Sequence, residues 1–416
     1  MIAELCERFG IAGDLERAAR RAYGRTVHFQ YPAQQRVAAN VVAAFLAEGL
    51  AESDLAGTLG YGYDDPSRAH YESLLARIFG TERALARLSL VSGTHAIVAT
   101  IAACTPPGAT LLSISGTPYD TLRNALCDAP CALAREGIAY REVALAGGAE
   151  PDLPAVRKAL SEHTVATVFI QRSRGYAPRR SLSIAQCAAA CATVRECAPG
   201  AVILVDNCYG ELVEEREPTH AGADAVMGSL IKNLGGSIAP AGAYVAGSAS
   251  VLDRVAARLY APGLGSALGP SLGVGRTLIQ GLFLAPLIVE QSLRGLDFAA
   301  ALFEELGFEV DPKAGDSRTD IVQAIRLGSP EALVRFSAGL QSAMPLNARF
   351  RPEPGSVPGY TDPVIMSSGA FVAGSTIELS CDAPLRAPYE VYLQGGVCAA
   401  HAYLGTLFAA RAVVES

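Results

Sequence analysis

Hydrophobic residues recur at helical spacing through the first 50 residues of the chain. In the segment 36–50 the apolar side chains fall three or four positions apart, which predicts one apolar helix face made of Val37, Val41, Val42, Phe45 and Leu46. A loop rich in Gly, Tyr and Asp follows at 57–66. A second helix is predicted with Ser67 as its N-cap, Phe79 as its last residue and Gly80 just past its end.

From residue 88 onward, short apolar runs rich in β-branched residues alternate with helical patterns. Buried strands are predicted at 111–115, 165–171 and 202–205. The helical patterns between them lie at 121–126, 152–161 and 183–195. Strands separated by helices predict a mainly parallel α/β sheet with crossover connections.

The pattern changes after Pro262. Residues 273–306 predict long, mostly apolar helices, and three further strands are predicted at 308–310, 321–325 and 376–379. These elements are typical of a smaller α+β unit, and a flexible Ala-Pro-Gly-Leu-Gly junction precedes them. We therefore expect a helical arm at 1–55, a large α/β domain at 56–261 and a C-terminal α+β domain at 262–416.

Composition excludes several classes of protein. Of the 416 residues, 50% are hydrophobic and 18% are charged, which excludes a disordered chain, and a net charge of −7 does not suggest a nucleic-acid partner. The ten cysteines form no CxxC pair and have no zinc spacing, so we expect buried thiols in a reducing compartment and no metal site. The uncharged stretches 88–119 and 233–252 are broken by Gly, Ser, Thr or Pro, and the first residues do not resemble a signal peptide. We expect a cytoplasmic protein without a membrane span.

The chain has only three lysines, which limits the choice for any reaction that needs an amine. Lys158 and Lys313 lie in polar surroundings and are expected to be solvated. Lys232 differs, because no other charged residue occurs between Asp224 and Asp253. Apolar surroundings lower the pKa of a lysine, which is the condition for a Schiff-base amine. The alternative is a lysine that extends its ammonium to solvent from the end of an element.

The neighbours of Lys232 favour the first interpretation. Asp206 ends an apolar strand, and the carboxyl ends of parallel strands face the ligand crevice of such sheets. Ser229 precedes Lys232 by three residues, and the turn 90–97 opens a helix whose free amides form an anion seat. An anion seat, a strand-end carboxylate and a buried lysine together meet the requirements of pyridoxal phosphate, whose ring acts as an electron sink.

Ten short strings spread over most of the chain strengthen this interpretation. They are 60–65, 91–96, 117–121, 169–176, 205–211, 228–233, 280–286, 318–321, 358–366 and 392–396. In these strings the chain resembles the pyridoxal-phosphate enzymes of cysteine and methionine metabolism, and more narrowly their methionine gamma-lyase-like or aluminium-resistance branch. The resemblance implies an aspartate-aminotransferase-like fold (fold type I), with a mainly parallel large domain and a smaller C-terminal α+β domain.

The resemblance also implies roles for individual residues. Lys232 would hold the cofactor aldehyde and act as the base at Cα, and Asp206 would pair with the ring nitrogen. Ser229 would bind the phosphate together with the amides of Gly93 and Thr94. Tyr119 would stack on the ring.

Tyr61 is implied to reach into the site of a neighbouring subunit, near the phosphate and the leaving group. Here the chain departs from the better-known lyases, which carry Tyr-x-Arg in this loop where this chain has Tyr61-Gly-Tyr63. Arg68 is the residue expected to take over the phosphate charge. The resemblance implies a homodimer or homotetramer with shared active sites.

The substrate carboxylate needs a cation, preferably a forked arginine. We favour Arg386, because the comparable arginine of the wider family comes from the C-terminal domain, and Arg172 and Arg174 are the alternatives. A structural ion pair remains the alternative role for each of the three. His95, Tyr63 and Tyr176 are ambiguous in the same way, between contact with the cofactor and packing.

The predicted function is β- or γ-elimination on a sulfur-containing or otherwise γ-substituted amino acid, with a thiol or a halide as leaving group. The motifs leave γ-replacement open, because the early steps are shared. A pseudo-enzyme on the same fold is the non-enzyme alternative, and the presence of both Lys232 and Asp206 speaks against it.

Overall fold

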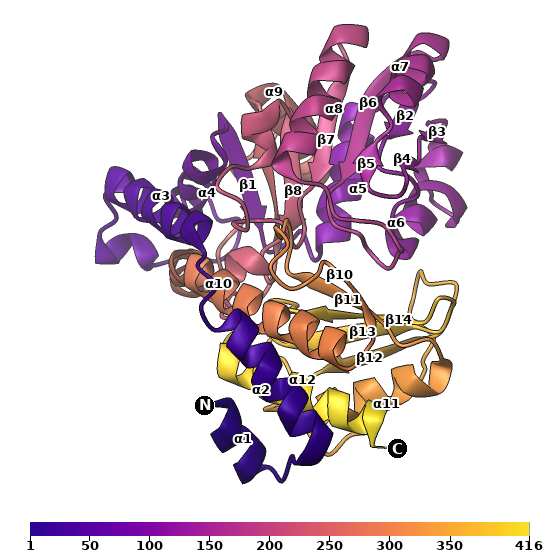
Figure 1. Cartoon of the computed structure of the whole chain (residues 1–416). Helices are drawn as coiled ribbons and strands as arrows, with labels where there is room; N and C mark the ends of the chain where they lie inside the picture. Colours follow the sequence, from indigo (N-terminus) through magenta and orange to yellow (C-terminus); the bar gives the residue numbers. More distant parts are fainter. Residues whose placement is uncertain (416) are drawn as a thin grey trace.

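The computed structural model describes residues 1–415, which form two large sheets and a two-stranded one, β4-β5, with helices packed around them (Figure 1). The larger sheet has seven strands in the order β1-β9-β8-β7-β6-β2-β3. Their bounds are β1 Arg83–Arg87, β2 Thr110–Ser113, β3 Ala139–Glu142, β6 Val165–Gln171, β7 Val202–Asp206, β8 Ala225–Ser229 and β9 Ala243–Gly247. Strand β9 runs antiparallel to both of its neighbours, and the other pairs are parallel. The mainly parallel sheet is as predicted.

Both faces of this sheet are buried. Leu204 of β7 packs in the core that α5 (Gly93–Cys104) and α9 (Ala249–Tyr260) cover, whereas Ile203 and Val205 face the opposite core. Two-sided burial explains why the strands are continuous apolar runs without alternation. The opposite core contains α4 (Pro66–Phe79), α7 (Leu153–Glu162) and α8 (Ile184–Cys197). The remaining short elements are η1 Glu52–Leu55, α6 Asp120–Arg123, η2 Asn124–Asp128, η3 Leu133–Glu136, β4 Leu145–Ala146, β5 Glu150–Pro151, η4 Pro218–Ala221 and η5 Asn233–Gly235.

The N-cap of helix α4 lies two residues earlier than predicted. Its N-cap is Asp65, whose Oδ1 accepts a hydrogen bond of 3.0 Å from the amide of Arg68. Pro66 occupies the first helical position, where its missing N–H costs nothing. The predicted cap Ser67 lies inside the helix and donates its hydroxyl to Asp65. Gly80 ends the helix in the left-handed conformation, as predicted.

The smaller sheet is antiparallel, in the order β10-β11-β14-β13-β12. Its strands are β10 Glu309–Asp311, β11 Val322–Arg326, β12 Val364–Ser368, β13 Ser380–Pro384 and β14 Glu390–Gln394, and α11 (Pro330–Gln341) and α12 (Ala399–Val414) pack on it. The strand predicted at 376–379 is wrong, because β13 begins only at Ser380. The carboxylate of Glu378 accepts the amide of Phe371 at 2.9 Å, and this bond closes a turn where a strand was expected.

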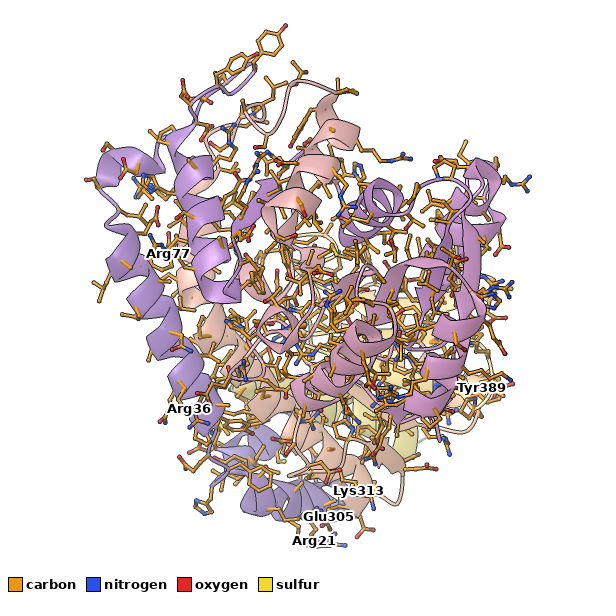
Figure 2. The ribbon with its side chains drawn as sticks, turned by 90° about the horizontal axis from the view of Figure 1, so that it is seen from above. Arg21, Arg36, Arg77, Glu305, Lys313 and Tyr389 are labelled. Atoms are coloured by element: carbon orange, nitrogen blue, oxygen red, sulfur yellow. The ribbon has the colours of Figure 1, made fainter. Side chains whose placement is uncertain are left out.

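A single helix, α10 (Gly275–Glu305), stands where several apolar helices were predicted. It contacts α2 (Gly13–Thr26), α3 (Pro32–Glu48), α4 and α12, so it touches elements around both sheets. At its end, Glu305 binds Nε of Arg21 in α2 at 2.6 Å (Figure 2). The first helix, α1 (Ile2–Arg8), packs on α2 near the C-terminal elements, whereas α3 lies beside α4 (Figure 1). Over residues 1–415, no helix is long and apolar enough to cross a membrane.

Candidate active site

A cavity of about 280 Å³ lies where three parallel strands end. Strands β6, β7 and β8 end at Gln171, Asp206 and Ser229, and all three residues line the cavity. The start of α5 forms a second side. Tyr360 and Gly374, from the chain beyond α10, complete the wall. The cavity therefore occupies the crevice position expected for a ligand of an α/β sheet.

Lys232 lies in this cavity, three residues after β8. Its Nζ is 3.8 Å from the centre of the Tyr209 ring, a cation–π contact. Burial alone lowers the pKa of Lys232, but Tyr209, Cys208 and Asp206 raise it, and the net pKa is above the ordinary value of a lysine. The low pKa predicted for this amine is therefore wrong for the free side chain. Lys158 and Lys313 are exposed at the surface, as predicted.

Asp206 is buried at the floor of the cavity. Its Oδ1 accepts a hydrogen bond of 3.1 Å from the amide of Cys208. Burial raises the pKa of this carboxyl, while the Cys208 amide and the charge of Lys232 offset part of the rise. A cationic partner in the cavity would lower the pKa further and keep the carboxylate ionised.

The first turn of α5 borders the cavity, at the place where the sequence predicts an anion seat. Ser92 caps the helix by accepting the amide of His95 at 3.1 Å, and no acidic side chain lies in the first turn. A Cβ on Gly93 would lie 3.2 Å from Sγ of Cys208 and 3.5 Å from the amide nitrogen of Ser229. Glycine therefore lets the helix start approach the end of β8 closely. The side chain of His95 is not among those that line the cavity.

Tyr119 is held by two hydrogen bonds at the cavity wall. Its hydroxyl shares a hydrogen bond of 2.8 Å with Oγ1 of Thr94, and its amide donates to Oε1 of Gln171 at 2.9 Å. Burial, together with the charge of Asp206, raises the pKa of Tyr119 well above its usual value. The phenol is therefore neutral, with its ring fixed beside the anion seat.

Tyr176 belongs to a stack of three aromatic rings. Its ring centre lies 5.5 Å from that of Tyr360 on one side and 5.5 Å from that of Tyr392 on the other. Tyr176 and Tyr360 both line the cavity. The stack joins the loop after β6 to the C-terminal unit and closes the cavity with aromatic surface.

The loop residues Tyr61, Tyr63 and Arg68 do not line the cavity of their own chain. Tyr61 is 76% exposed and Tyr63 is 57% exposed. Nη1 of Arg68 donates to the carbonyls of Gly62 and Gly269, each at 2.6 Å. Within one chain Arg68 thus fixes the loop, and the contact of this loop with a neighbouring subunit stays a prediction.

The three arginines expected near the substrate carboxylate lie outside the cavity lining. Arg172 is completely buried and donates to Asn207 and to the carbonyl of Gly210, each at 2.8 Å, besides its ion pair with Glu214. Because these contacts occupy its donors, Arg172 stabilises the fold. The prediction that Arg172 binds the substrate carboxylate is wrong.

Arg174 and Arg386 are also held by carboxylates. Arg174 pairs with Asp311. Nη1 of Arg386 binds Asp120 at 3.1 Å, and its Nη2 donates to the carbonyl of Tyr176 at 2.6 Å. Arg386 therefore adjoins the aromatic stack without lining the cavity, and its contact with a substrate stays a prediction.

Sequence reasoning missed Arg179. This side chain is buried, forms no ion pair among the described residues, and leaves Nε and Nη1 without a partner. Its Nη2 donates to the carbonyls of Gln171 and Ser173, which both line the cavity. Burial lowers the pKa of Arg179 to about 10. The sequence does contain a signal for it. After the strand 165–171 come Arg172 and Arg174, and Arg179 and Arg180 form a second pair of arginines.

The residues of the cavity fit the pyridoxal phosphate that the resemblance implies. Gly93, Thr94 and Ser229 line the cavity together, so the positive end of α5 borders the space where a phosphate would bind. Asp206 offers a buried carboxylate for a ring nitrogen, and Lys232 offers an amine. No cluster of His, Cys, Asp and Glu within residues 1–415 could hold a metal ion.

Comparison with known proteins gives consistent matches. A family model for methionine gamma-lyase matches residues 16–414. The protein YnbB of Bacillus subtilis is 40% identical over 365 residues, which are 87% of this chain and 86% of YnbB. Among solved structures, a candidate cystathionine beta-lyase involved in aluminium resistance from Clostridium acetobutylicum is 39% identical with a TM-score of 0.94, over 99% of this chain and 98% of that one. A carbon-sulfur lyase involved in aluminium resistance from Clostridium novyi is 37% identical with a TM-score of 0.93, over 99% of each chain. The match over almost the whole length confirms the predicted fold and shows that the chain belongs to the methionine gamma-lyase family.

Proposed function

We propose that this protein is a pyridoxal-phosphate-dependent carbon–sulfur lyase that catalyses elimination at Cβ or Cγ of a sulfur-containing amino acid. One observation carries the proposal: Lys232, Asp206 and the anion seat at Gly93 and Ser229 converge on one cavity. Membership of the methionine gamma-lyase family supports the same reaction class. When bound, the cofactor supplies an electron sink adjacent to Cα of the substrate.

The side chains of the cavity bind the cofactor, transfer the proton and exclude water. Lys232 is the amine that takes the cofactor aldehyde and then carries the proton removed from Cα. Asp206 holds a proton on the ring nitrogen by its negative charge. Thr94 fixes the hydroxyl of Tyr119, so that the Tyr119 ring keeps a constant position at the cavity wall, where it would stack on the ring of a bound cofactor. The Tyr176–Tyr360 stack limits the entry of water from the C-terminal side.

A product assay tests the reaction class. The purified protein is incubated with cystathionine, methionine, homocysteine and γ-halogenated amino acids, and products are identified by mass spectrometry. Elimination gives a 2-oxo acid, ammonia and the leaving group. A product that appears only when a thiol nucleophile is added would instead favour γ-replacement. The Lys232→Ala chain is the control, and turnover equal to that of the wild type in this variant would contradict the proposal.

We further propose that the active unit is a homodimer or a homotetramer with shared sites. The loop that carries Tyr61 and Tyr63 presents aromatic rings to solvent, and it makes no part of its own cavity. Exposed aromatic side chains that do not pack in the core or line a site of their own chain are typical of a subunit interface. All ten cysteines are free, which suits the reducing cytoplasm that we propose as the location. The expectation that the thiols are buried is wrong for Cys131, Cys197 and Cys398, which are exposed.

A further inference from the structure

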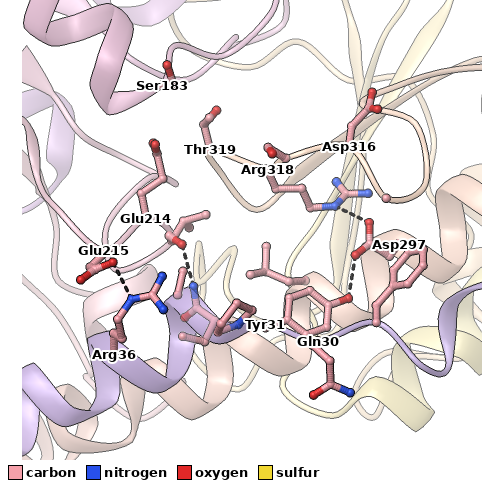
Figure 3. Close-up of a pocket in the computed structure, with 18 residues that line it drawn as sticks. Gln30, Tyr31, Arg36, Ser183, Glu214, Glu215, Asp297, Asp316, Arg318 and Thr319 are labelled. Carbon is pink, nitrogen blue, oxygen red and sulfur yellow. Dashed lines mark hydrogen bonds and ion pairs between the residues drawn. The ribbon is translucent and has the colours of Figure 1, made fainter.

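A second cavity lies beside the first turn of α3 (Figure 3). Its volume is about 590 Å³, and it shares no lining residue with the cavity of Lys232. Five segments form it: residues 29–36 at the start of α3, Ser183 before α8, the loop around Glu214, the second half of α10 at Leu293 and Asp297, and the loop 315–319. The function proposed above leaves this cavity without a role.

Most charged side chains of the second cavity are already paired. Nε of Arg36 binds Glu215 at 2.5 Å, at the exposed rim. Nε of Arg318 binds Oδ1 of Asp297 at 2.8 Å, and Tyr31 donates to Oδ2 of the same carboxylate at 2.6 Å (Figure 3). These pairs leave neither acid free for a ligand.

Asp316 is different. Glu214, the other acid of the cavity, pairs with the buried Arg172 behind it. For Asp316, no arginine, lysine or histidine of the described chain lies within ion-pair distance, and its carboxylate accepts one hydrogen bond, of 3.1 Å, from the amide of Lys313. Asp316 is exposed and lines the cavity, so it can receive a cationic group from a ligand.

Two buried side chains that line this cavity have a polar atom without a partner. The side chain of Arg318 is 4% exposed and its Nη1 has no acceptor, and Gln34 is 2% exposed and its Oε1 has no donor. A buried polar group without a hydrogen bond is costly, and such groups in folded proteins call for an explanation. Nη1 requires an acceptor such as a carboxylate. The start of α3 has no acidic side chain and no side-chain cap, so its dipole favours the same negative group.

We propose that the second cavity binds a free α-amino acid in its zwitterionic form. The carboxylate lies toward Arg318 and the start of α3, and the ammonium group lies toward Asp316. Val213 and Leu293 offer apolar wall for an aliphatic side chain. A simple anion is the poorer ligand, because four acids line the cavity against two arginines.

The segment 318–321 connects this cavity to the site of Lys232. Arg318 lines the second cavity, and two residues later Oδ2 of Asp320 accepts the hydroxyl of Ser173 at 2.7 Å. The amide of Ile321 then donates to the carbonyl of Tyr209 at 3.1 Å. Ser173 and Tyr209 both line the Lys232 cavity. Four residues of chain therefore join Arg318 to two groups of the catalytic site, and the exchange experiment below tests whether binding is transmitted along them.

Calorimetric titration of the full chain with L-leucine tests the binding, because leucine has no leaving group to eliminate. Its amine without the carboxylate and its 2-oxo acid without the ammonium are titrated in parallel. Each is expected to bind about tenfold more weakly or worse, since each lacks one charge-assisted contact. Asp316→Asn is expected to weaken leucine binding about tenfold, and Glu215→Gln, the matched acid that is already paired, should bind as the wild type does.

The Lys232→Ala chain prepared without cofactor separates this inference from the proposed function, because the first cavity then holds neither the amine nor an aldehyde that leucine could react with, and the second cavity is intact. Leucine binding is expected to persist there, with the same loss on Asp316→Asn. Binding that requires Lys232, or that is equal in Asp316→Asn and the wild type, would overturn the proposal. Hydrogen exchange supplies the readout for the connection: leucine should slow exchange at 318–322 in the wild type and not in Asp316→Asn. Unchanged exchange in the wild type would disprove the connection.

Discussion

The amine of Lys232 lies over the ring of Tyr209 and within the influence of Asp206, and both neighbours favour its charged form. This is why the sequence predicts the position of the lysine but not its protonation: periodicity shows that the surroundings are apolar, whereas Tyr209 comes close only through a turn with a positive φ of 71°. The convergence of Asp206, Ser229 and Gly93 with Lys232 could be predicted, because parallel strand ends meet at one edge. No such rule predicts that Tyr360 and Gly374 line the same cavity.

Lys232 is expected to carry the cofactor covalently. Reduction of the holoenzyme with borohydride, followed by peptide mapping, should place a pyridoxyl group on the peptide that contains Lys232, because this is the one lysine that lines the cavity of the described chain. Lys158 is the internal control, since it is exposed on α7. Label on Lys158 or Lys313 would contradict the assignment.

Asp206 is expected to matter for chemistry more than for cofactor binding. Asp206→Ala should retain part of the cofactor through Lys232 and the anion seat, yet slow exchange of the α-proton by about 100-fold or more, because an unprotonated ring is a poor electron sink. Proton exchange measured by NMR in deuterated water provides the value. Near-normal exchange would show that another group protonates the ring.

At the scale of elements, strands were predicted better than the polar features that end them. Strand β6 has the predicted bounds, because burial on both faces leaves an uninterrupted apolar run. The strand predicted at 376–379 is wrong because the side chain of Glu378 accepts backbone amides and closes a turn. Such a hydrogen bond cannot be predicted from the local pattern of hydrophobic residues. The start of α4 was misplaced for a related reason: Asp65 and Ser67 are both good capping residues, and only the partners of Asp65 distinguish them.

Asp65 is expected to contribute far more to stability than an ordinary helix cap. It is buried and accepts the amides of Arg68, Thr58 and Ser271, so Asp65→Ala leaves several buried donors unpaired and should cost roughly 2–4 kcal/mol. Asp152→Ala is the matched control, because Asp152 caps α7 through the single amide of Ala155 and its loss should cost about 1 kcal/mol. Urea unfolding of the three proteins gives the difference, and equal losses would refute the argument.

The same carboxylate predicts how stability depends on pH. Burial alone would raise the pKa of Asp65, but its hydrogen bonds hold the folded-state pKa well below the usual range. A group with a lowered folded-state pKa stabilises the protein above its unfolded pKa of about 4 and loses that effect as the pH falls through its folded-state value. The part of acid destabilisation due to Asp65 should therefore be absent in Asp65→Asn.

At the scale of the whole molecule, shared active sites can be tested by mixing. Tyr61→Ala and Lys232→Ala chains, each nearly inactive, should complement after subunit exchange, because one site of each hybrid dimer holds both intact residues. A random mixture of two-site dimers would recover up to about a quarter of wild-type activity. Lys232→Ala mixed with Asp206→Ala is the control, since these two residues line one cavity of one chain and should not complement. No recovery with Tyr61→Ala, after exchange is confirmed, would assign Tyr61 to its own chain.

Helix α10 has a consequence for how this protein can evolve or be engineered. Its 31 residues extend for roughly 46 Å, and one apolar helix completes the packing around both sheets. A gene divided near the junction at 262 would therefore yield two fragments. One would expose the apolar face of α10 to water, and the other would expose the surface of α2, α3 and α4 on which α10 packs. The two units are not interchangeable modules, and recombination within the family should exchange surface loops more readily than whole domains.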